Sequence, residues 1–149
     1  MGDPRADRDL PAPPAGTARG HRARHVRERD RTLHHIISAG DYYRTLLAGV
    51  ERRWRSADPV PPLDELARRA EELAAFWEAF LAEPFDPERI VVDEGGRLEI
   101  RAGVLLAQAL THGTDHRTQV LTILTTLGVE HPDLDAWDYG RATGRVRSI

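Results

Sequence analysis

Residues 104–124 read VLLAQALTHGTDHRTQVLTIL and form the most apolar stretch of the chain. Their length and composition predict one helix from about Ala102 to Leu127. His112 and His116 lie four residues apart on this helix, so their side chains project from one face with Cβ atoms roughly 6 Å apart. Two imidazoles in this position can hold one metal ion, or they can be buried histidines bonded to carbonyls or water. Spacing and context favour the two interpretations equally.

Apolar residues at helical spacing predict two earlier helices. The first begins near Asp30, a suitable N-cap residue, and runs to about Arg55. The second covers roughly Leu63 to Ala82. Residues 89–100 read as a β-hairpin, because strand formers flank a Gly-Gly turn. The chain is therefore predicted to be mainly α, a helical bundle with a short β-hairpin before its last long helix. We expect the tail to fold back onto the bundle through Leu134, Trp137 and Tyr139.

His34 and His35, near the start of the first predicted helix, are candidates for a third metal ligand. His35 is in line with Ser38 and Tyr42, which places it beside the apolar stripe of that helix. A histidine in this position is more often a hydrogen-bonded core residue, so its place on the helix does not by itself identify a ligand.

Two segments resemble the DinB/YfiT-like superfamily. His112-Gly-Thr-Asp-His116-Arg-Thr-Gln119, followed by an apolar run, resembles the H-x3-H-R-x-Q helix of these proteins. The segment LHHIISAGDYY, residues 33–43, resembles their other ligand helix, and the match falls on His35, with His34 as the runner-up. The predicted hairpin and the Trp-Asp-Tyr tail also fit. The resemblance covers about residues 30–140 and implies an up-down four-helix bundle that binds a divalent metal through His35, His112 and His116.

Residues 1–29 lack the apolar stripe that the first helix of such a bundle would need. Four prolines fall within the first fourteen residues, and an Arg-rich run follows. This composition predicts a disordered Arg/Pro-rich arm ahead of a bundle domain spanning residues 30–149, with the first helix of the family missing or replaced. A bundle without one wall exposes apolar surface, so we expect a homodimer that covers aromatic side chains. The aromatic residues that motivate this expectation are Trp54, Phe76, Trp77 and Phe80.

Composition excludes several function classes. Cysteine is absent, so disulfides, thiolate ligands and a cysteine nucleophile are excluded. Residues 1–31 carry eight Arg against five acidic residues, whereas the remainder carries 13 Arg against 19 acidic residues, which argues against a nucleic-acid interface on the folded part. No segment approaches the ~20 apolar residues of a membrane span, and no secretory signal is visible, so a cytoplasmic location is expected.

Three neutral imidazoles leave a coordination position open, as in catalytic metal sites, and zinc or nickel suits such ligands. The resemblance implies a metal-dependent enzyme acting on a small molecule, since family members include thiol-dependent transferases and isomerases that use mycothiol or bacillithiol. A low-molecular-weight thiol is thus a candidate cosubstrate, and a hydrolase is a further candidate. Tyr42, Gln108 and Gln119 are candidates for contacts to the imidazoles or the substrate, or are ordinary polar residues of the bundle. No general base is identified.

Two other classes of function remain as alternatives. One is a non-catalytic metal-binding helical bundle. The other is a stress-associated interaction protein whose Arg-rich arm binds phosphate.

Overall fold

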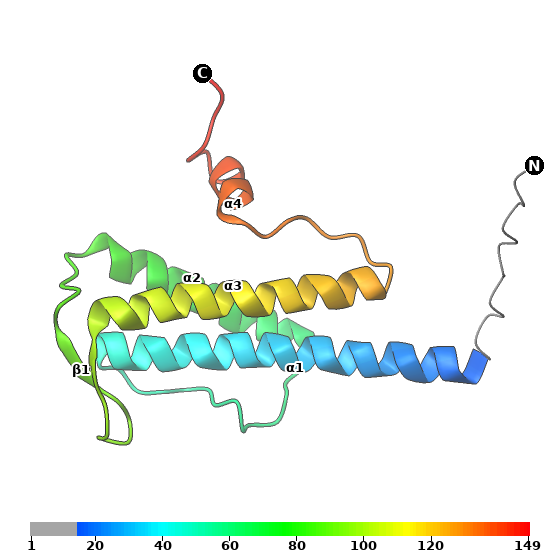
Figure 1. The fold of residues 1–149 in the computed structure, drawn as a ribbon, viewed down its shortest axis with the longest axis horizontal. Coiled ribbons are helices and arrows are strands. Elements are labelled where there is room, and N and C mark those ends of the chain that lie inside the picture. Colours follow the sequence, from blue (N-terminus) through cyan, green and yellow to red (C-terminus); the bar gives the residue numbers. More distant parts are fainter. Residues whose placement is uncertain (1–14) are drawn as a thin grey trace, which may run out of the picture.

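The computed structural model describes the backbone of residues 15–149 and the side chains from residue 19 onward. In this part of the chain the elements follow the order α1 (Ala15–Ala48), α2 (Leu63–Ala82), β1 (Ile90–Val92), β2 (Glu99–Arg101), α3 (Ala102–Thr126) and α4 (Ala136–Ala142). The protein is mainly helical, with a short antiparallel hairpin before α3. Helices α1 and α3 lie side by side and run in opposite directions, and α2 packs against α1 (Figure 1). None of the described helices is long and apolar enough to cross a membrane.

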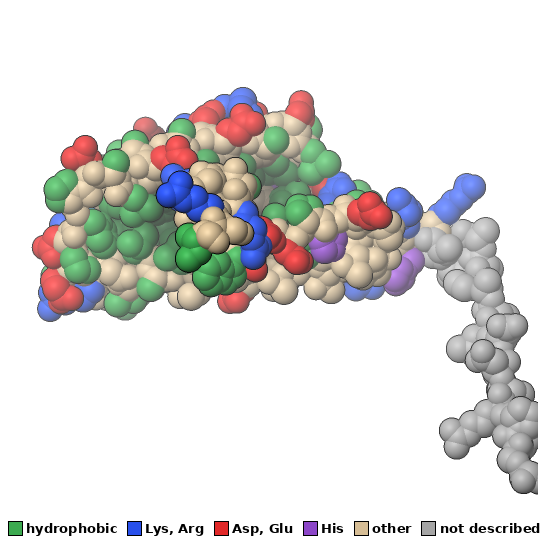
Figure 2. Space-filling view, turned by 90° about the horizontal axis from the view of Figure 1, so that it is seen from above, with side chains coloured by type: hydrophobic (Ala, Val, Ile, Leu, Met, Phe, Trp, Pro, Cys, Tyr) green, Lys and Arg blue, Asp and Glu red, His purple; other side chains and the backbone are tan. Residues whose placement is uncertain are grey.

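Helix α1 begins at Ala15, so the expected start near Asp30 is wrong. Residues 15–29 have no apolar stripe, but they contain no proline and are rich in Ala and Arg, which are strong helix formers. An ion pair between Arg24 and Glu28 one turn apart, with an N–O distance of 3.4 Å, adds local support. Helix propensity therefore extends α1 well past the end of α3, where it shows basic and histidine side chains rather than apolar ones (Figures 1 and 2).

The predicted disorder of residues 1–14 lies outside the described residues. The division of the chain at residue 29 into an arm and a bundle domain stays a prediction.

Helix α1 also ends earlier than expected, at Ala48 rather than Arg55. Gly49 adopts a left-handed conformation with φ of +66°, and its N–H donates to the carbonyl of the preceding turn. The fully buried carboxylate of Asp41 then accepts the backbone N–H groups of Arg53 and Trp54 at 2.6 and 2.8 Å. These bonds turn residues 49–62 back along α1. The buried side chain of Trp54 therefore belongs to a loop and not to a helix.

The middle of the chain matches the prediction closely. Helix α2 has the expected bounds, and the hairpin pairs Val91 with Ile100 across a turn in which Gly96 has a φ of +66°. Helix α3 ends at Thr126, and Gly128 beyond it takes the left-handed conformation that closes many helices.

The core lies along α1, which packs against both α2 and α3. One cluster joins α1 to α3 and the hairpin, and a second joins α1 to α2 and Trp54. Helices α2 and α3 leave a groove between them, lined by side chains of all three helices. The described part of the chain is therefore a bundle of three long helices with one open wall.

The tail does not cover this bundle, so that expectation is wrong. Helix α4 stands away from the long helices in Figure 1. It is stabilised locally, because Asp135 caps its N-terminus and Gly140 packs closely on Val146. Three apolar side chains therefore stay exposed: Leu134, Trp137 and Tyr139.

The aromatic side chains that motivated the homodimer are largely covered within one chain. Trp54 is buried, and Phe76, Trp77 and Phe80 are half-buried and pack on one another with ring centroids 5.4 to 5.8 Å apart. Contacts within one chain therefore bury much of their surface without a second subunit. The homodimer stays a prediction.

Candidate metal centre

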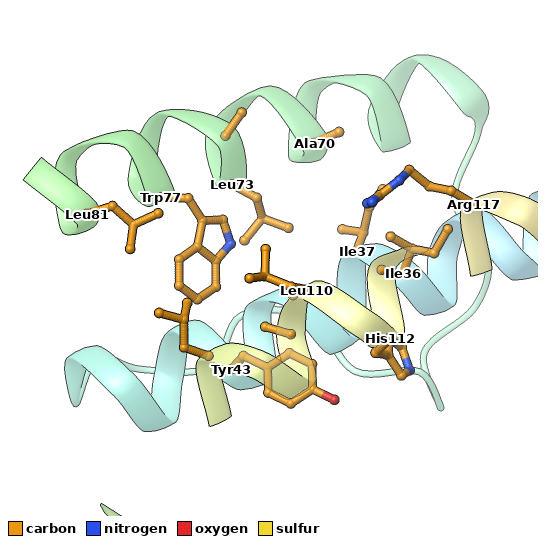
Figure 3. Close-up of a pocket in the computed structure, with 15 residues that line it drawn as sticks. Ile36, Ile37, Tyr43, Ala70, Leu73, Trp77, Leu81, Leu110, His112 and Arg117 are labelled. Carbon is orange, nitrogen blue, oxygen red and sulfur yellow. The ribbon is translucent and has the colours of Figure 1, made fainter. Parts of the chain in front are cut away.

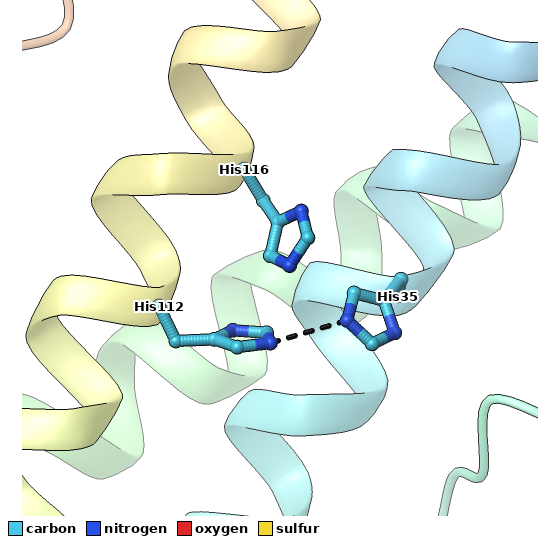
Figure 4. A group of neighbouring side chains, drawn as sticks. All are labelled: His35, His112 and His116. Carbon is cyan, nitrogen blue, oxygen red and sulfur yellow. Dashed lines mark hydrogen bonds between the residues drawn. The ribbon is translucent and has the colours of Figure 1, made fainter.

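Three histidines from two helices converge at the α1–α3 contact. His35 comes from α1, and His112 and His116 come from successive turns of α3 (Figure 4). Nε2 of His35 lies 3.1 Å from Nε2 of His112, and one ring nitrogen of each histidine lies within 4.8 Å of the others. Antiparallel packing of two helices thus brings together residues that are 77 positions apart in the sequence.

The donor set fits a divalent metal ion. Zn–N bonds of about 2.0–2.1 Å at tetrahedral to octahedral angles place two ligand nitrogens roughly 2.9–3.4 Å apart. The Nε2 atoms of His35 and His112 already have this separation. Among the described residues the cluster contains imidazoles only, with no carboxylate, which is a ligand set suited to zinc or nickel.

Electrostatics favour the neutral forms of His35 and His112, and the neutral imidazole is the form that binds metal. Burial lowers the pKa of His35 below 6.5, and the neighbouring His116 lowers it further. The pKa of His112 is lowered first by burial and then by His116 and His35. A ring that resists protonation keeps a lone pair available for coordination.

Two polar side chains orient the rings. Nδ1 of His116 lies 2.8 Å from Oε1 of Gln119, one of the three candidates from the sequence. Nδ1 of His35 lies 3.3 Å from Oγ of Ser56. When each Nδ1–H donates to its oxygen, Nε2 is left with the lone pair that faces the cluster. Ser56 was missed by sequence reasoning, since nothing in its neighbourhood signals that Asp41 folds residues 49–62 back along α1.

The other two candidates from the sequence are Gln108 and Tyr42. Gln108 is exposed, and its side chain makes no hydrogen bond within the described residues. Tyr42 is half-buried under the guanidinium of Arg52, which is 4.8 Å from the ring centroid. Burial, then Asp93 and Glu94, raise the pKa of Tyr42, so its phenol keeps its proton at neutral pH.

His34, the runner-up for the third ligand, faces a different part of the molecule. It is buried, its Nε2 has no hydrogen-bond partner among the described residues, and burial followed by the charge of Arg69 lowers its pKa. The structure therefore brings His35, rather than His34, together with the two histidines of α3.

Fold and site together describe a helical bundle with a three-histidine cluster between two antiparallel helices. The family model described as the DinB family matches residues 19–147. The chain belongs to the DinB family. The match begins inside the Arg-rich part of α1 and so includes residues that the sequence reading had assigned to an arm. No curated protein and no solved structure matches the chain.

Proposed function

We propose that this protein is a metal-dependent enzyme that acts on a small molecule, with one zinc or nickel ion held by His35, His112 and His116. The observation that carries the proposal is the convergence of three imidazoles, without a fourth protein ligand among the described residues. Three protein ligands leave room for a substrate, whereas structural zinc sites are closed by four.

A bound ion would act as a Lewis acid and lower the pKa of a thiol or water that reaches it. The chain's own residues have other tasks. Ser56 and Gln119 fix the orientation of two rings through their Nδ1 atoms. All three histidines are partly exposed, so a small molecule can approach the cluster from solvent.

A thiol cosubstrate would have to come from outside the chain, because the protein contains no cysteine. We therefore include a low-molecular-weight thiol of the mycothiol or bacillithiol type in the proposal, for a transferase or isomerase reaction. Hydrolysis is the version of the proposal that needs no thiol.

Turnover by metal-loaded protein tests the proposal. Zinc- and nickel-loaded full-length protein would be assayed with a reactive aromatic halide plus mycothiol or bacillithiol, and with an activated ester without thiol. We expect turnover that requires metal and is lost in His112→Ala, with His131→Ala as a histidine control outside the cluster. Turnover that persists without metal, or in His112→Ala, would contradict the proposal.

One observation favours a non-catalytic metal-binding bundle as the second candidate. The described partners of the three rings, apart from each other, are a hydroxyl and an amide, neither of which is an acid or base at neutral pH. Stoichiometric metal binding without turnover of any thiol or ester substrate would support this candidate over the enzyme.

A further inference from the structure

The groove between α2 and α3 is a cavity whose lining differs chemically from the histidine cluster. It has a volume of about 340 Å³, within the range of small-molecule sites. Ile36 and Ile37 of α1 form its floor, and Leu73 and Trp77 of α2 face Leu110 of α3 across it (Figure 3). Apolar side chains also gather over the bundle in the space-filling view (Figure 2).

The groove and the histidine cluster lie on different sides of the α1–α3 contact. On α1, His35 and the groove residue Ile36 are consecutive, so their side chains project about 100° apart. His112 is the one member of the cluster that lines the groove, and its Nε2 is turned toward His35. A small molecule bound in the groove is therefore separate from a molecule bound to a metal ion at the cluster.

Among the described residues that line the groove, Arg117 is the single charged one, and it lies at the end away from Leu81 (Figure 3). The guanidinium lies close to Gly113 one turn earlier, where a Cβ would be 3.0 Å from Nη1 of Arg117. The guanidinium donates to the hydroxyl of Thr114 at 3.0 Å. Its hydrogen-bond partner among the described residues is thus a neutral hydroxyl and not a carboxylate.

We propose that this groove binds a small amphipathic carboxylate, such as a medium-chain fatty acid. The hydrocarbon part would lie along the apolar walls, where it covers side chains such as Leu110 that are otherwise exposed. The carboxylate would pair with Arg117, whose planar guanidinium suits two-pronged recognition of such a group. The charge at one end and the apolar walls along the rest match this class of ligand.

Titration of the full-length protein with hexanoate, octanoate and decanoate tests the proposal, with Trp77 of the groove wall as the fluorescent reporter. Affinity should rise with chain length by up to roughly fourfold per methylene, the equivalent of its burial. Decanoate should bind at least tenfold more tightly than decanol, which lacks the charge. Because Nε2 of His112, the cluster residue that lines the groove, is turned toward His35, metal-free and metal-loaded protein should give the same result.

Two kinds of variant test separately the pairing of the carboxylate with Arg117 and the burial of the hydrocarbon part in the groove. Arg117→Gln should remove the preference for decanoate over decanol. Ala74→Trp, at an exposed position on the groove wall, should fill the groove and abolish binding. Arg31→Gln, on the exposed surface of α1, is the matched control and should bind as the wild type does.

The proposal is overturned if decanoate does not bind, if Ala74→Trp binds it normally, or if Arg117→Gln keeps the carboxylate preference. Sedimentation of the same samples tests whether a second copy of the chain occupies the groove instead. A stable dimer that excludes decanoate would show that a second copy fills the groove, and would also overturn the proposal.

Discussion

Ser56 is the residue through which the loop after α1 reaches the histidine cluster. Its hydroxyl contacts Nδ1 of His35, the nitrogen opposite the one that faces the cluster. Partners of this kind fix ring orientation, and their loss typically costs about 10–100-fold in metal affinity.

We expect Ser56→Ala to weaken zinc binding by about tenfold, because the His35 ring loses the contact that selects its tautomer. Competition with a chromophoric chelator measures the affinity. Ser56→Thr should restore it, and Ser148→Ala in the tail is the matched control. Equal zinc affinity in Ser56→Ala and the wild type would show that this contact does not position the ring.

The buried charge of Asp41 holds the loop that follows α1. Its carboxylate is fully buried, pairs with Arg44 at 2.7 Å and accepts two backbone N–H groups of the following loop. Asp41→Ala leaves a nearly buried guanidinium and two backbone donors without this partner.

The expected cost of Asp41→Ala is about 3–5 kcal/mol in the free energy of unfolding, as is typical when one partner of a buried ion pair is removed. Urea unfolding of metal-free protein measures it. Asp138→Ala, which removes an exposed i,i+3 pair on α4, should cost less than about 1 kcal/mol. Similar losses in both variants would mean that Asp41 does not hold the loop.

At the residue scale, the sequence carries readable signals for the histidine cluster where those signals are local. His112 and His116 share a helical face by their spacing alone, and family resemblance singled out His35 over its neighbour. Ser56 could not be predicted, because its contact depends on a loop path fixed by hydrogen bonds to Asp41 rather than by any periodic pattern.

Among the elements, the packing of α1 on α3 and α2 governs how the protein responds to acid. Burial is the largest cause of the lowered pKa of His34, His35 and His112. Well above pH 6.5 these rings are neutral in both folded and unfolded chains. As the pH falls below 6.5, the unfolded chain takes up protons that the folded chain resists, so stability is lost.

We therefore expect the Tm of metal-free protein to fall between pH 7.5 and pH 5. His34→Leu should reduce the slope, because one of the three groups no longer titrates. Differential scanning calorimetry at constant ionic strength measures both. A Tm that is flat or rises on acidification would contradict the lowered pKa values.

The projecting part of α1 is held by little more than its own helix propensity. Residues 19–24 are exposed, and the described contact from this part to the rest is a 3.5 Å bond from Arg22 to the carbonyl of Leu127. Deleting residues 1–22 should reduce helical ellipticity but leave the Tm within a few degrees of the wild type. A large drop in Tm, measured by circular dichroism, would show that this segment supports the core.

Elements were predictable where apolar periodicity and turn residues agree. The bounds of α2 and the hairpin followed from such signals. Both ends of α1 were misplaced, because its start rests on Ala and Arg propensity without burial and its end on Gly49 and Asp41. The tail was misplaced as well, since exposed Trp137 belongs to a short helix that is stabilised locally.

At the scale of the whole molecule, three long helices create two distinct sites around the α1–α3 pair. The histidine cluster lies at their contact, and the groove with Arg117 lies where α2 and α3 diverge. Residues 15–29 continue α1 instead of forming a separate helix, so the described part of the chain leaves one wall of the bundle open.

The number of metal ions bound per full-length chain tests directly whether His35, His112 and His116 hold a metal ion. Chelator-treated wild type, His35→Ala and His34→Ala would be titrated with zinc and analysed for bound metal, with helicity checked in each sample. We expect about one ion per chain in the wild type and in His34→Ala, and none retained by His35→Ala. Fully helical wild type that takes up neither zinc nor nickel, or an ion lost in His34→Ala and kept in His35→Ala, would contradict it.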